Sequence, residues 1–520
     1  MLVSFGYLQI ISAVDKKLSV QELVCQFVGY AHLVRALSLR VIPIKQPALV
    51  RPVTRVEEGD NCLVVPQRMA PPADHHLAHV LFALKHEGMN MAVLAQALPK
   101  LPERDLLEAL AEAPGGAYIR KACYLWEAFT GKRLPYEENA KGNKVLLFDP
   151  DRYITGPSIR NSRWRVDFNG LGSLRYCATV ERTADICALL DFEVPAKSRV
   201  FIKSLSPGMR DRVIQLGYLH ETRDSFAIER ESPSQDIADR FAHLLRLAHE
   251  RKPLTEDYLV RLQNSTTSSP YDVAVAFRYE QNHLSNGLKG VAGVTYIPPP
   301  PALCRELMEE LMAFANAAPM CIDPLIAGAV ISFGFVFLHP FMDGNGRLSR
   351  FLIHQALCSA GALENGLLLP ISVAMKREEQ RYLKALQSFS RPARELWSVR
   401  WIGAQDMSLQ FEGDPSIYRY WDATECVAFT LEMARRALEV ELREVTEFLR
   451  AYDKVVKAVD ERFDVRGSDL SRLVIMCLDN QGRVSQHRRT QFRYRVQEKV
   501  FDYIEEQVQL ALSGSGEELG

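Results

Sequence analysis

The chain of 520 residues lacks any close pairing of cysteines. Its ten cysteines are scattered, and they form neither a Cys-x-x-Cys pair nor a metal-finger spacing. Such a distribution is typical of buried free thiols in a reducing compartment. It argues against a small disulfide-stapled scaffold and against a zinc finger.

Long apolar runs and a targeting segment are missing as well. No window approaches about eighteen uninterrupted apolar residues, the length that a membrane-spanning helix needs. The opening stretch MLVSFGYLQIISAVDKKL has no basic segment before its apolar part and no small-residue cleavage site after it, so we expect no signal peptide. A cytoplasmic protein without a membrane partner is therefore expected.

An excess of one charge sign is the third absence. Lysine and arginine number 63, aspartate and glutamate 64, and the formal net charge is −1. The whole chain therefore has no field that would attract nucleic acid, and such a role would have to rest on a local patch.

The length predicts about three or four domains. Residues 1–75 mix β-branched residues with prolines, which indicates short strands of uncertain fold. Residues 76–200 begin with short helical patterns and continue as a connecting region with some strand. The short helices fit a small packing domain or a winged-helix module.

Longer helical patterns dominate the rest of the chain. They occupy a central domain over residues 205–400 and a C-terminal helical domain over residues 404–512, which a flexible Gly/Ser/Glu tail at 513–520 follows. The predicted fold class is mainly α and multi-domain, with an N-terminal α+β region and a central helical domain that carries a β-hairpin.

The segment HPFMDGNGRLSR at 339–350 concentrates reactive residue types between two helical patterns. The pattern before it, 323–338, is apolar nearly all round, as in a helix at the centre of a bundle. Pro340 cannot continue that helix, so His339 is expected at its end. After the motif, Arg347 and Arg350 share one face of the next helix.

This set of residues suits an anion site with a base beside it. Glycines and free backbone amides at a helix N-terminus bind phosphate, and two arginines on the adjacent turn add charge for a polyphosphate. Asp343 is well placed to hold Mg²⁺ beside phosphate oxygens. His339 can act as general base on an incoming hydroxyl, so the residues point to phosphoryl or nucleotidyl transfer.

The motif matches in full the signature HPFx[D/E]GN[G/K]RxxR, and residues 205–400 resemble the Fic (Fido) family domain. The resemblance implies an enzyme that transfers AMP from ATP to a Ser, Thr or Tyr hydroxyl of a target protein. It implies His339 as general base and Asp343 as Mg²⁺ ligand. The implied phosphate-binding residues are Gly344, Asn345, Gly346, Arg347 and, at the γ-phosphate, Arg350.

Two further elements resemble parts of this family. A hairpin at about 275–298 looks like the flap that holds a target segment by backbone pairing, and Arg278 and Asn282 are its expected docking residues. The segment DSFAIERE resembles an inhibitory helix of pattern [S/T]xxxE[G/N], expected over about 222–232. Ser225 and Glu229 fit that pattern, whereas Arg230 stands where glycine or asparagine is usual.

In the resembling pattern the glutamate pairs with the second motif arginine, here Arg350, and blocks the γ-phosphate position. The expected activity is therefore self-inhibited protein AMPylation with auto-modification. Two alternatives stay open: removal of AMP or transfer of another phosphate-containing group at the same site, and a nucleotide-sensing regulator that binds DNA or a partner.

The arginine-rich stretch 471–496 contains Arg483, Arg488, Arg489, Arg493 and Arg495. It fits a winged-helix module on a phosphate backbone, while the neutral overall charge favours a solvated helical face or a homodimer contact.

Overall fold

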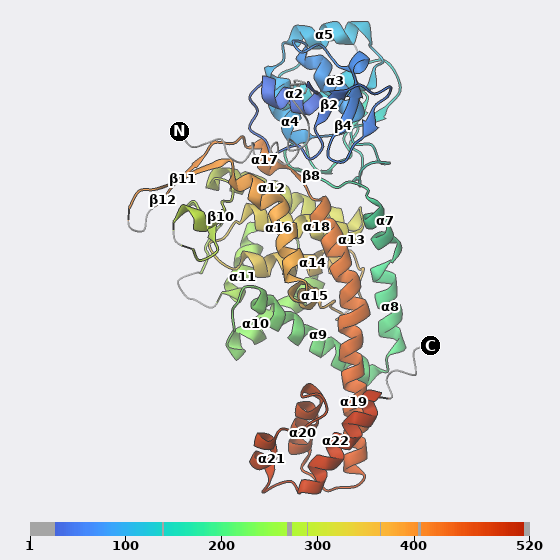
Figure 1. Ribbon diagram of the computed structural model, residues 1–520, viewed down its shortest axis with the longest axis vertical. Helices are drawn as coiled ribbons and strands as arrows, with labels where there is room; N and C mark the ends of the chain where they lie inside the picture. Colours follow the sequence, from blue (N-terminus) through green and yellow to red (C-terminus); the bar gives the residue numbers. More distant parts are fainter. Residues whose placement is uncertain are drawn as a thin grey trace, which may run out of the picture. The chain divides into compact units, whose positions relative to one another are not determined.

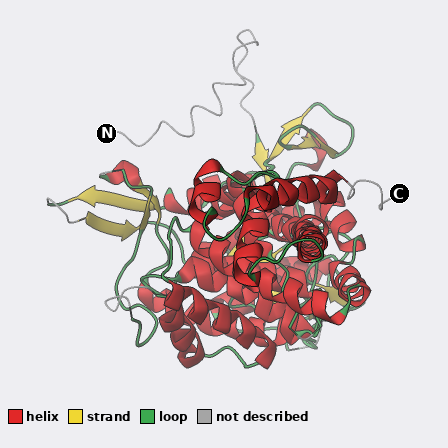
Figure 2. Cartoon of the chain, turned by 90° about the horizontal axis from the view of Figure 1, so that it is seen from below, coloured by secondary structure: helices red, strands yellow, loops and turns green. Residues whose placement is uncertain are grey.

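The computed structural model describes residues 26–137, 140–267, 273–288, 290–364, 366–403 and 407–513. The chain divides into two compact units, Met1–Gly142 and Asn143–Gly520. Helices make up most of the described chain (Figures 1 and 2), so the fold is mainly α and multi-domain, as predicted. The first 25 residues and the expected tail after Ser513 lie outside the described residues.

The first unit combines a small sheet with helices. The sheet has the strand order β1-β2-β4-β3, in which β2 and β4 are parallel. Its strands are β1 (Phe27–Val28), β2 (Ala48–Arg51), β3 (Glu57–Glu58) and β4 (Leu63–Pro66). The helices are α2 (Gly29–Ala36), α3 (His76–His86), α4 (Met91–Ala97), α5 (Glu103–Glu112) and α6 (Ala117–Thr130).

Strands and helices of this unit share one core. Val28, Ala48 and Val65 of the sheet pack with Phe82 of α3. The expected α+β region is therefore present. The residues on either side of the boundary predicted at residue 75, however, pack in the same core and belong to one unit. An apolar sheet face this small needs the helix to cover it.

The connecting region after residue 142 belongs to the second unit, which corrects its predicted grouping with residues 76–142. It contains β5 (Val145–Leu146), β6 (Val166–Asp167), β7 (Leu171–Gly172) and β8 (Cys177–Thr179). Strand β8 pairs in parallel with β13 (Tyr420–Asp422), far along the chain. The buried Trp421 indole donates to the Tyr176 hydroxyl at 3.0 Å, which ties the two segments together.

The centre of the second unit is α13 (Pro324–Leu338), whose side chains are buried nearly all round. It packs against α12 (Pro301–Ala317), α14 (Asn345–Ser359) and α18 (Thr424–Arg436). The surrounding helices are α7 (Ala184–Asp191), α8 (Val194–Ser204), α9 (Pro207–Ile228), α10 (Gln235–Leu247), α11 (Glu256–Thr266), α15 (Ile371–Arg377), α16 (Glu379–Arg394) and α17 (Ser416–Arg419). Within the described ranges, no helix is both long and apolar enough to cross a bilayer.

Two hairpins project from these helices. The expected flap hairpin is formed by β9 (Leu284–Ser285) and β10 (Val294–Tyr296). A second hairpin, β11 (Trp397–Trp401) with β12 (Met407–Phe411), packs against β10 through Trp397 and Val294. The domain boundary predicted between residues 400 and 404 falls inside this hairpin, because its two strands are hydrogen-bonded to each other.

The C-terminal region is helical, as predicted. A π-helical segment, Ala437–Glu441, links α18 to the long α19 (Leu442–Asp460), and α20 (Gly467–Asp479), α21 (Gln486–Phe492) and α22 (Glu498–Ser513) follow. These last helices share a core with the end of α19, which includes Val455, Leu473, Phe492 and Phe501.

Candidate nucleotide site

His339 lies at the C-terminal end of α13 in a left-handed conformation, with φ 52° and ψ 60°. Its Nδ1 is 3.2 Å from the carbonyl oxygen of Val336. Because a carbonyl can only accept, Nδ1 carries the hydrogen and Nε2 keeps a free lone pair. Burial lowers the pKa of His339 to about 4, so the ring is neutral at pH 7 and can accept a proton.

Arg278 holds the loop that presents His339, and its docking role stays a prediction. Its side chain is only 5% exposed. Nε donates to the His339 carbonyl at 2.8 Å, Nη1 donates to the Glu280 carbonyl at 3.0 Å, and Nη2 donates to the Pro299 carbonyl. The guanidinium therefore acts within the chain, where it holds three backbone carbonyls in place.

Asn282, the other expected docking residue, is half-buried at the base of the flap. Its amide nitrogen is 3.5 Å from the Met342 carbonyl oxygen, and its side-chain oxygen accepts from the His283 amide at 2.6 Å. The flap therefore begins beside the motif loop. Docking by Asn282 stays a prediction.

The motif loop turns into α14 at Gly344, which caps the helix with φ 82°. Asn345 is 2% exposed, and its amide group bonds both backbone groups of Phe341, at 3.0 and 2.7 Å. The asparagine side chain thus shapes the loop, and only its backbone is left for an anion. Free amides at the start of α14 make an anion site there.

Glu229 already places a carboxylate at this position. A methyl group added to Gly346 would come within 2.1 Å of Glu229 Oε1. The same oxygen lies 2.9 Å from Nη1 of Arg350, whose side chain is 2% exposed. An anionic group of the protein therefore sits where the residues predict a phosphate.

Ser225 contacts the same guanidinium from α9. Arg350 donates from Nε to the Ser225 hydroxyl at 2.9 Å and from Nη2 to the Ser225 carbonyl at 2.7 Å. The predicted helix over about 222–232 is in fact the end of α9, which stops at Ile228 with Glu229 as its cap.

The backbone reverses directly after Glu229. Arg230 has φ 60°, in the left-handed region that favours glycine or asparagine. Arg230, which stands where the pattern has glycine or asparagine, therefore still adopts the left-handed cap conformation. The backbone cost relative to glycine is about 1–2 kcal/mol.

Arg347 has a second carboxylate that the sequence did not identify. Its Nη1 donates to Glu231 Oε2 at 2.8 Å and to the Thr266 carbonyl at 3.1 Å, while Nη2 donates to Asp343 Oδ2 at 3.0 Å. Burial raises the pKa of Glu231, and Arg347 opposes the rise. The segment DSFAIERE already contained the information that points to Glu231. It holds two glutamates, and two buried arginines need two carboxylate partners.

A buried pair one turn further along connects the same two helices. His354 Nε2 is 2.8 Å from Glu221 Oε1, and Glu221 also accepts from the backbone amide of Ser372 at 2.8 Å and from its hydroxyl. Glu221 and Ser225 on α9 thus face His354 and Arg350 on α14, four residues apart on each helix. This arrangement fixes the register of α9, and sequence reasoning did not find it.

The residues around Asp343 suit Mg²⁺ only together with a phosphate. The Asp343 carboxylate is 40% exposed and is paired with Arg347. Among the described residues, no group of three His, Cys, Asp or Glu side chains is arranged to hold a metal ion. One carboxylate plus phosphate oxygens is a common way to bind Mg²⁺, so the donor set fits the ion when a nucleotide is present.

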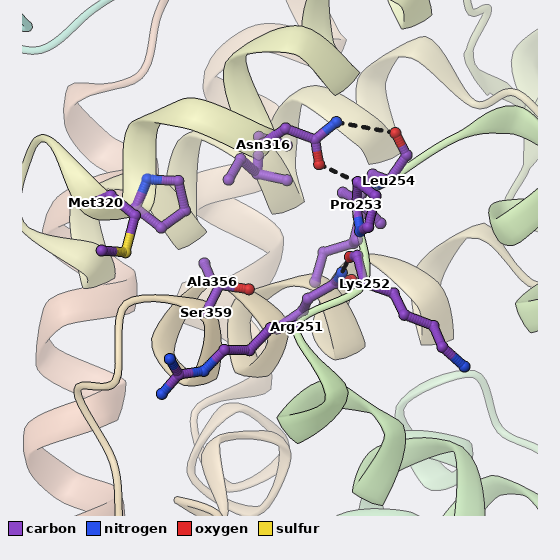
Figure 3. Close-up of a pocket in the computed structure, with 13 residues that line it drawn as sticks. Arg251, Lys252, Pro253, Leu254, Asn316, Met320, Ala356 and Ser359 are labelled. Atoms are coloured by element: carbon purple, nitrogen blue, oxygen red, sulfur yellow. Dashed lines mark hydrogen bonds between the residues drawn. The ribbon is translucent and has the colours of Figure 1, made fainter.

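A pocket elsewhere in the unit does not contain these residues. It lies between α12, α13, α14 and the segment that precedes α11 (Figure 3). The Asn316 side chain bonds both backbone groups of Leu254, at 2.7 and 3.0 Å, and therefore closes one wall. None of the predicted site residues lines it.

Comparison with known proteins gives a family match for this region. The model of the Fic/DOC family matches residues 253–357. "Protein adenylyltransferase Fic" of Culex quinquefasciatus is 32% identical over 93 residues, which are 18% of this chain and 17% of that protein. "Protein adenylyltransferase fic-1" of Caenorhabditis elegans is 23% identical over 159 residues, 30% of each protein. "Probable protein adenylyltransferase aq_aa38" of Aquifex aeolicus (strain VF5) is 32% identical over 97 residues, 19% of this chain and 27% of that protein.

These matches span 17–30% of the curated relatives' length. Among solved structures, a Fic family protein from Desulfovibrio desulfuricans G20 aligns with a TM-score of 0.39 and 18% identity, over 60% of this chain and 87% of that one. A Fic-domain signalling protein from Bacteroides thetaiotaomicron VPI-5482 aligns with a TM-score of 0.37 and 17% identity, over 51% and 96%. With the complete HPFMDGNGRLSR motif inside the segment that the family model matches, the chain carries a Fic/DOC family domain.

Proposed function

We propose that this protein is an adenylyltransferase that moves AMP from ATP to a Ser, Thr or Tyr hydroxyl of a target protein and that holds itself inactive. The observation that carries the proposal is the contact of Glu229 with both Gly346 and Arg350. A protein carboxylate there marks an anion site, because it lies beside both the Arg350 guanidinium and the N-terminal turn of α14. The names of the three relatives support AMP as the transferred group.

The proposed reaction begins with the base. The target hydroxyl gives its proton to Nε2 of His339 while its oxygen forms a bond to the α-phosphorus. The bond from that phosphorus to the bridging oxygen of the β-phosphate breaks, and pyrophosphate leaves. The ring is neutral at pH 7 and is held by the Val336 carbonyl, so it is ready to accept the proton.

The start of α14 would hold the phosphates. Backbone amides of Gly344, Asn345 and Gly346 would receive the α- and β-phosphates, and Arg347 and Arg350 would receive the outer charges. Asp343 would hold Mg²⁺, which neutralises phosphate charge when it is bound.

The inactive state follows from competition for the arginines. Arg350 is ion-paired with Glu229 and hydrogen-bonded to Ser225, so a γ-phosphate would have to displace the carboxylate or bind elsewhere. In the second case the α-phosphorus would not be in line with the attacking hydroxyl. Ordering or release of the end of α9 would then control the activity.

Two other functions remain as alternatives. In the first, Glu229 positions a water that removes AMP from a modified protein, or the site moves another phosphate-containing group. In the second, nucleotide binding regulates a partner without chemistry. The neutral, oriented His339 favours transfer over the second alternative, because binding alone does not need a base.

Labelled ATP separates AMP transfer from phosphotransfer and from nucleotide sensing. The Glu229→Gly variant is incubated with Mg²⁺ and ATP labelled at the α- or the γ-phosphate, with Glu229→Gly/His339→Ala as control. We expect label from the α-phosphate only, at least tenfold above the parent chain, and none in the control. Label from the γ-phosphate would instead indicate phosphotransfer, and bound but untransferred ATP would indicate a sensor.

A further inference from the structure

The C-terminal helices form a helix-turn-helix unit. Helices α20 and α21 are joined by six residues, 480–485, that turn sharply through Gln481 with φ 54° and Gly482 with φ 81°. The second helix, α21, begins at the cap Ser485, whose hydroxyl accepts from the Arg488 amide at 3.4 Å. Figure 1 shows α20, α21 and α22 grouped at the end of α19.

Apolar side chains hold α21 in place, and most of its other side chains face outward. Phe492 is buried in the core of these helices, together with Val484 before α21 and Val496 after it. The outward side chains are amides, hydroxyls, imidazole and guanidinium groups: Gln486, His487, Arg488, Thr490, Gln491 and Arg493. Side chains of these kinds hydrogen-bond base edges and phosphates.

The charge of this region is strongly segregated, although the chain as a whole is neutral. Residues 480–497 contain five arginines and no aspartate or glutamate. Three of the four acidic side chains of α22 point to one internal arginine, because Glu498, Asp502 and Glu505 each lie 2.7 Å from a guanidinium nitrogen of Arg489. They therefore do not neutralise the outer face of α21.

Three arginines are left for an external anion. Arg483, Arg488 and Arg493 form no ion pair with a carboxylate in the described part of the chain. Arg488 donates to Gln491 at 2.8 Å, which orients both side chains before any ligand binds. Arg495, by contrast, lies 3.6 Å from Asp469.

We propose that α21 is the recognition helix of a double-stranded DNA-binding module. The major groove admits an α-helix, and a helix-turn-helix presents its second helix there. Arg483, Arg488 and Arg493 would contact phosphates, while Gln486 and Thr490 would face base edges. This inference does not depend on the nucleotide chemistry of the Fic domain.

The test measures binding by the full chain. Fluorescence anisotropy follows a labelled 20-base-pair duplex of mixed sequence between about 50 and 200 mM salt, a range over which phosphate contacts weaken strongly. The parent is compared with Arg488→Ala/Arg493→Ala and with a matched control, Arg443→Ala/Arg450→Ala, which removes two exposed arginines from α19. Circular dichroism verifies that each variant is folded.

We expect the parent to bind and the Arg488/Arg493 variant to bind at least tenfold more weakly. Its slope of log affinity against log salt should fall by about 2, since each phosphate contact contributes about 0.9. The α19 control should match the parent. Selection from a random duplex library should enrich one sequence, and Gln486→Ala/Thr490→Ala should relax that preference.

Four outcomes would overturn the proposal. They are no binding at 50 mM salt, equal weakening in the α19 control, tighter binding to single-stranded or duplex RNA than to DNA, and a parent dimer that the Arg488/Arg493 substitutions dissociate. The last would identify the face of α21 as a contact between two copies of the chain.

Discussion

Glu229 and Arg350 meet at the N-terminus of α14, with Oε1 of the carboxylate 2.9 Å from Nη1 of the guanidinium. Two residues further on, Glu231 Oε2 lies 2.8 Å from Nη1 of Arg347. The segment directly after α9 thus supplies one carboxylate to each arginine of the motif. If both ion pairs keep the motif arginines from binding phosphate, ATP must compete with two carboxylates for these arginines.

Removal of either carboxylate should strengthen ATP binding. We expect Glu229→Gly to lower the Kd for ATP about fivefold and Glu231→Gln two- to threefold, because partly exposed ion pairs contribute about 1 kcal/mol or less. Glu231→Gln has the smaller effect since Asp343 still faces Arg347. Isothermal titration calorimetry measures both, and Glu447→Gln on α19 is the control. An unchanged Kd in Glu231→Gln would limit the restraint to Glu229.

Substitution of Arg230 by glycine should tighten the restraint. Arg230 has φ 60°, and glycine adopts this conformation without the side-chain penalty of about 1–2 kcal/mol. We expect Arg230→Gly to lower self-labelling of the parent chain and to raise Tm. Arg230→Ala, which removes the charge but keeps the penalty, should do neither. Equal behaviour of the two variants would mean that charge, and not backbone conformation, is what matters at this position.

His339 should stay neutral well below the usual range for histidine. Burial lowers its pKa to about 4, whereas an unperturbed histidine titrates near 6.5. The Cε1–H resonance that is lost in His339→Ala should therefore not shift between pH 8 and 5. The unfolded chain binds this proton more readily, so the stability contribution is complete above about pH 6.5 and is lost as the pH falls toward 4. A resonance with a midpoint near 6.5 would contradict the buried, neutral base.

Loss of Arg278 should disable the base without affecting nucleotide binding. Its guanidinium bonds the carbonyls of His339, Glu280 and Pro299. Arg278→Met leaves these carbonyls unpaired, at about 1–3 kcal/mol for each one that stays buried. We expect a lower Tm and a loss of labelling in the Glu229→Gly background, with ATP affinity retained.

The matched control for this experiment is Arg391→Met, an exposed arginine of α16. If Arg278→Met kept full self-labelling and only weakened recognition of a protein target, the result would support the predicted docking role instead.

Local patterns predicted much of the helical domain. The apolar run before the motif became the buried α13, and Pro340 ended it at His339. The spacing of Ser225 and Glu229 placed both on one side of α9, where both contact Arg350. Such features depend on neighbours within a turn or two, and a sequence states these directly.

Other features depended on segments that are distant in the chain. The parallel pairing of β8 with β13 moved residues 143–200 into the second unit, and the paired strands β11 and β12 removed a boundary. Arg278 has the sequence context of an exposed flap residue, but its guanidinium is buried among backbone carbonyls. No local signal reports a contact of this kind, because periodicity describes one segment and not what packs on it.

The sequence by itself determined which groups are available: a base, an anion site at a helix N-terminus, two arginines and a glutamate four residues after a serine. Only the tertiary structure decided which of these groups pair with one another. It pairs each arginine with its own carboxylate, because the register of α9 against α14 is set by the buried contact of Glu221 with His354. A charge inside a protein needs a partner, and the folded chain selects that partner among residues more than a hundred positions away.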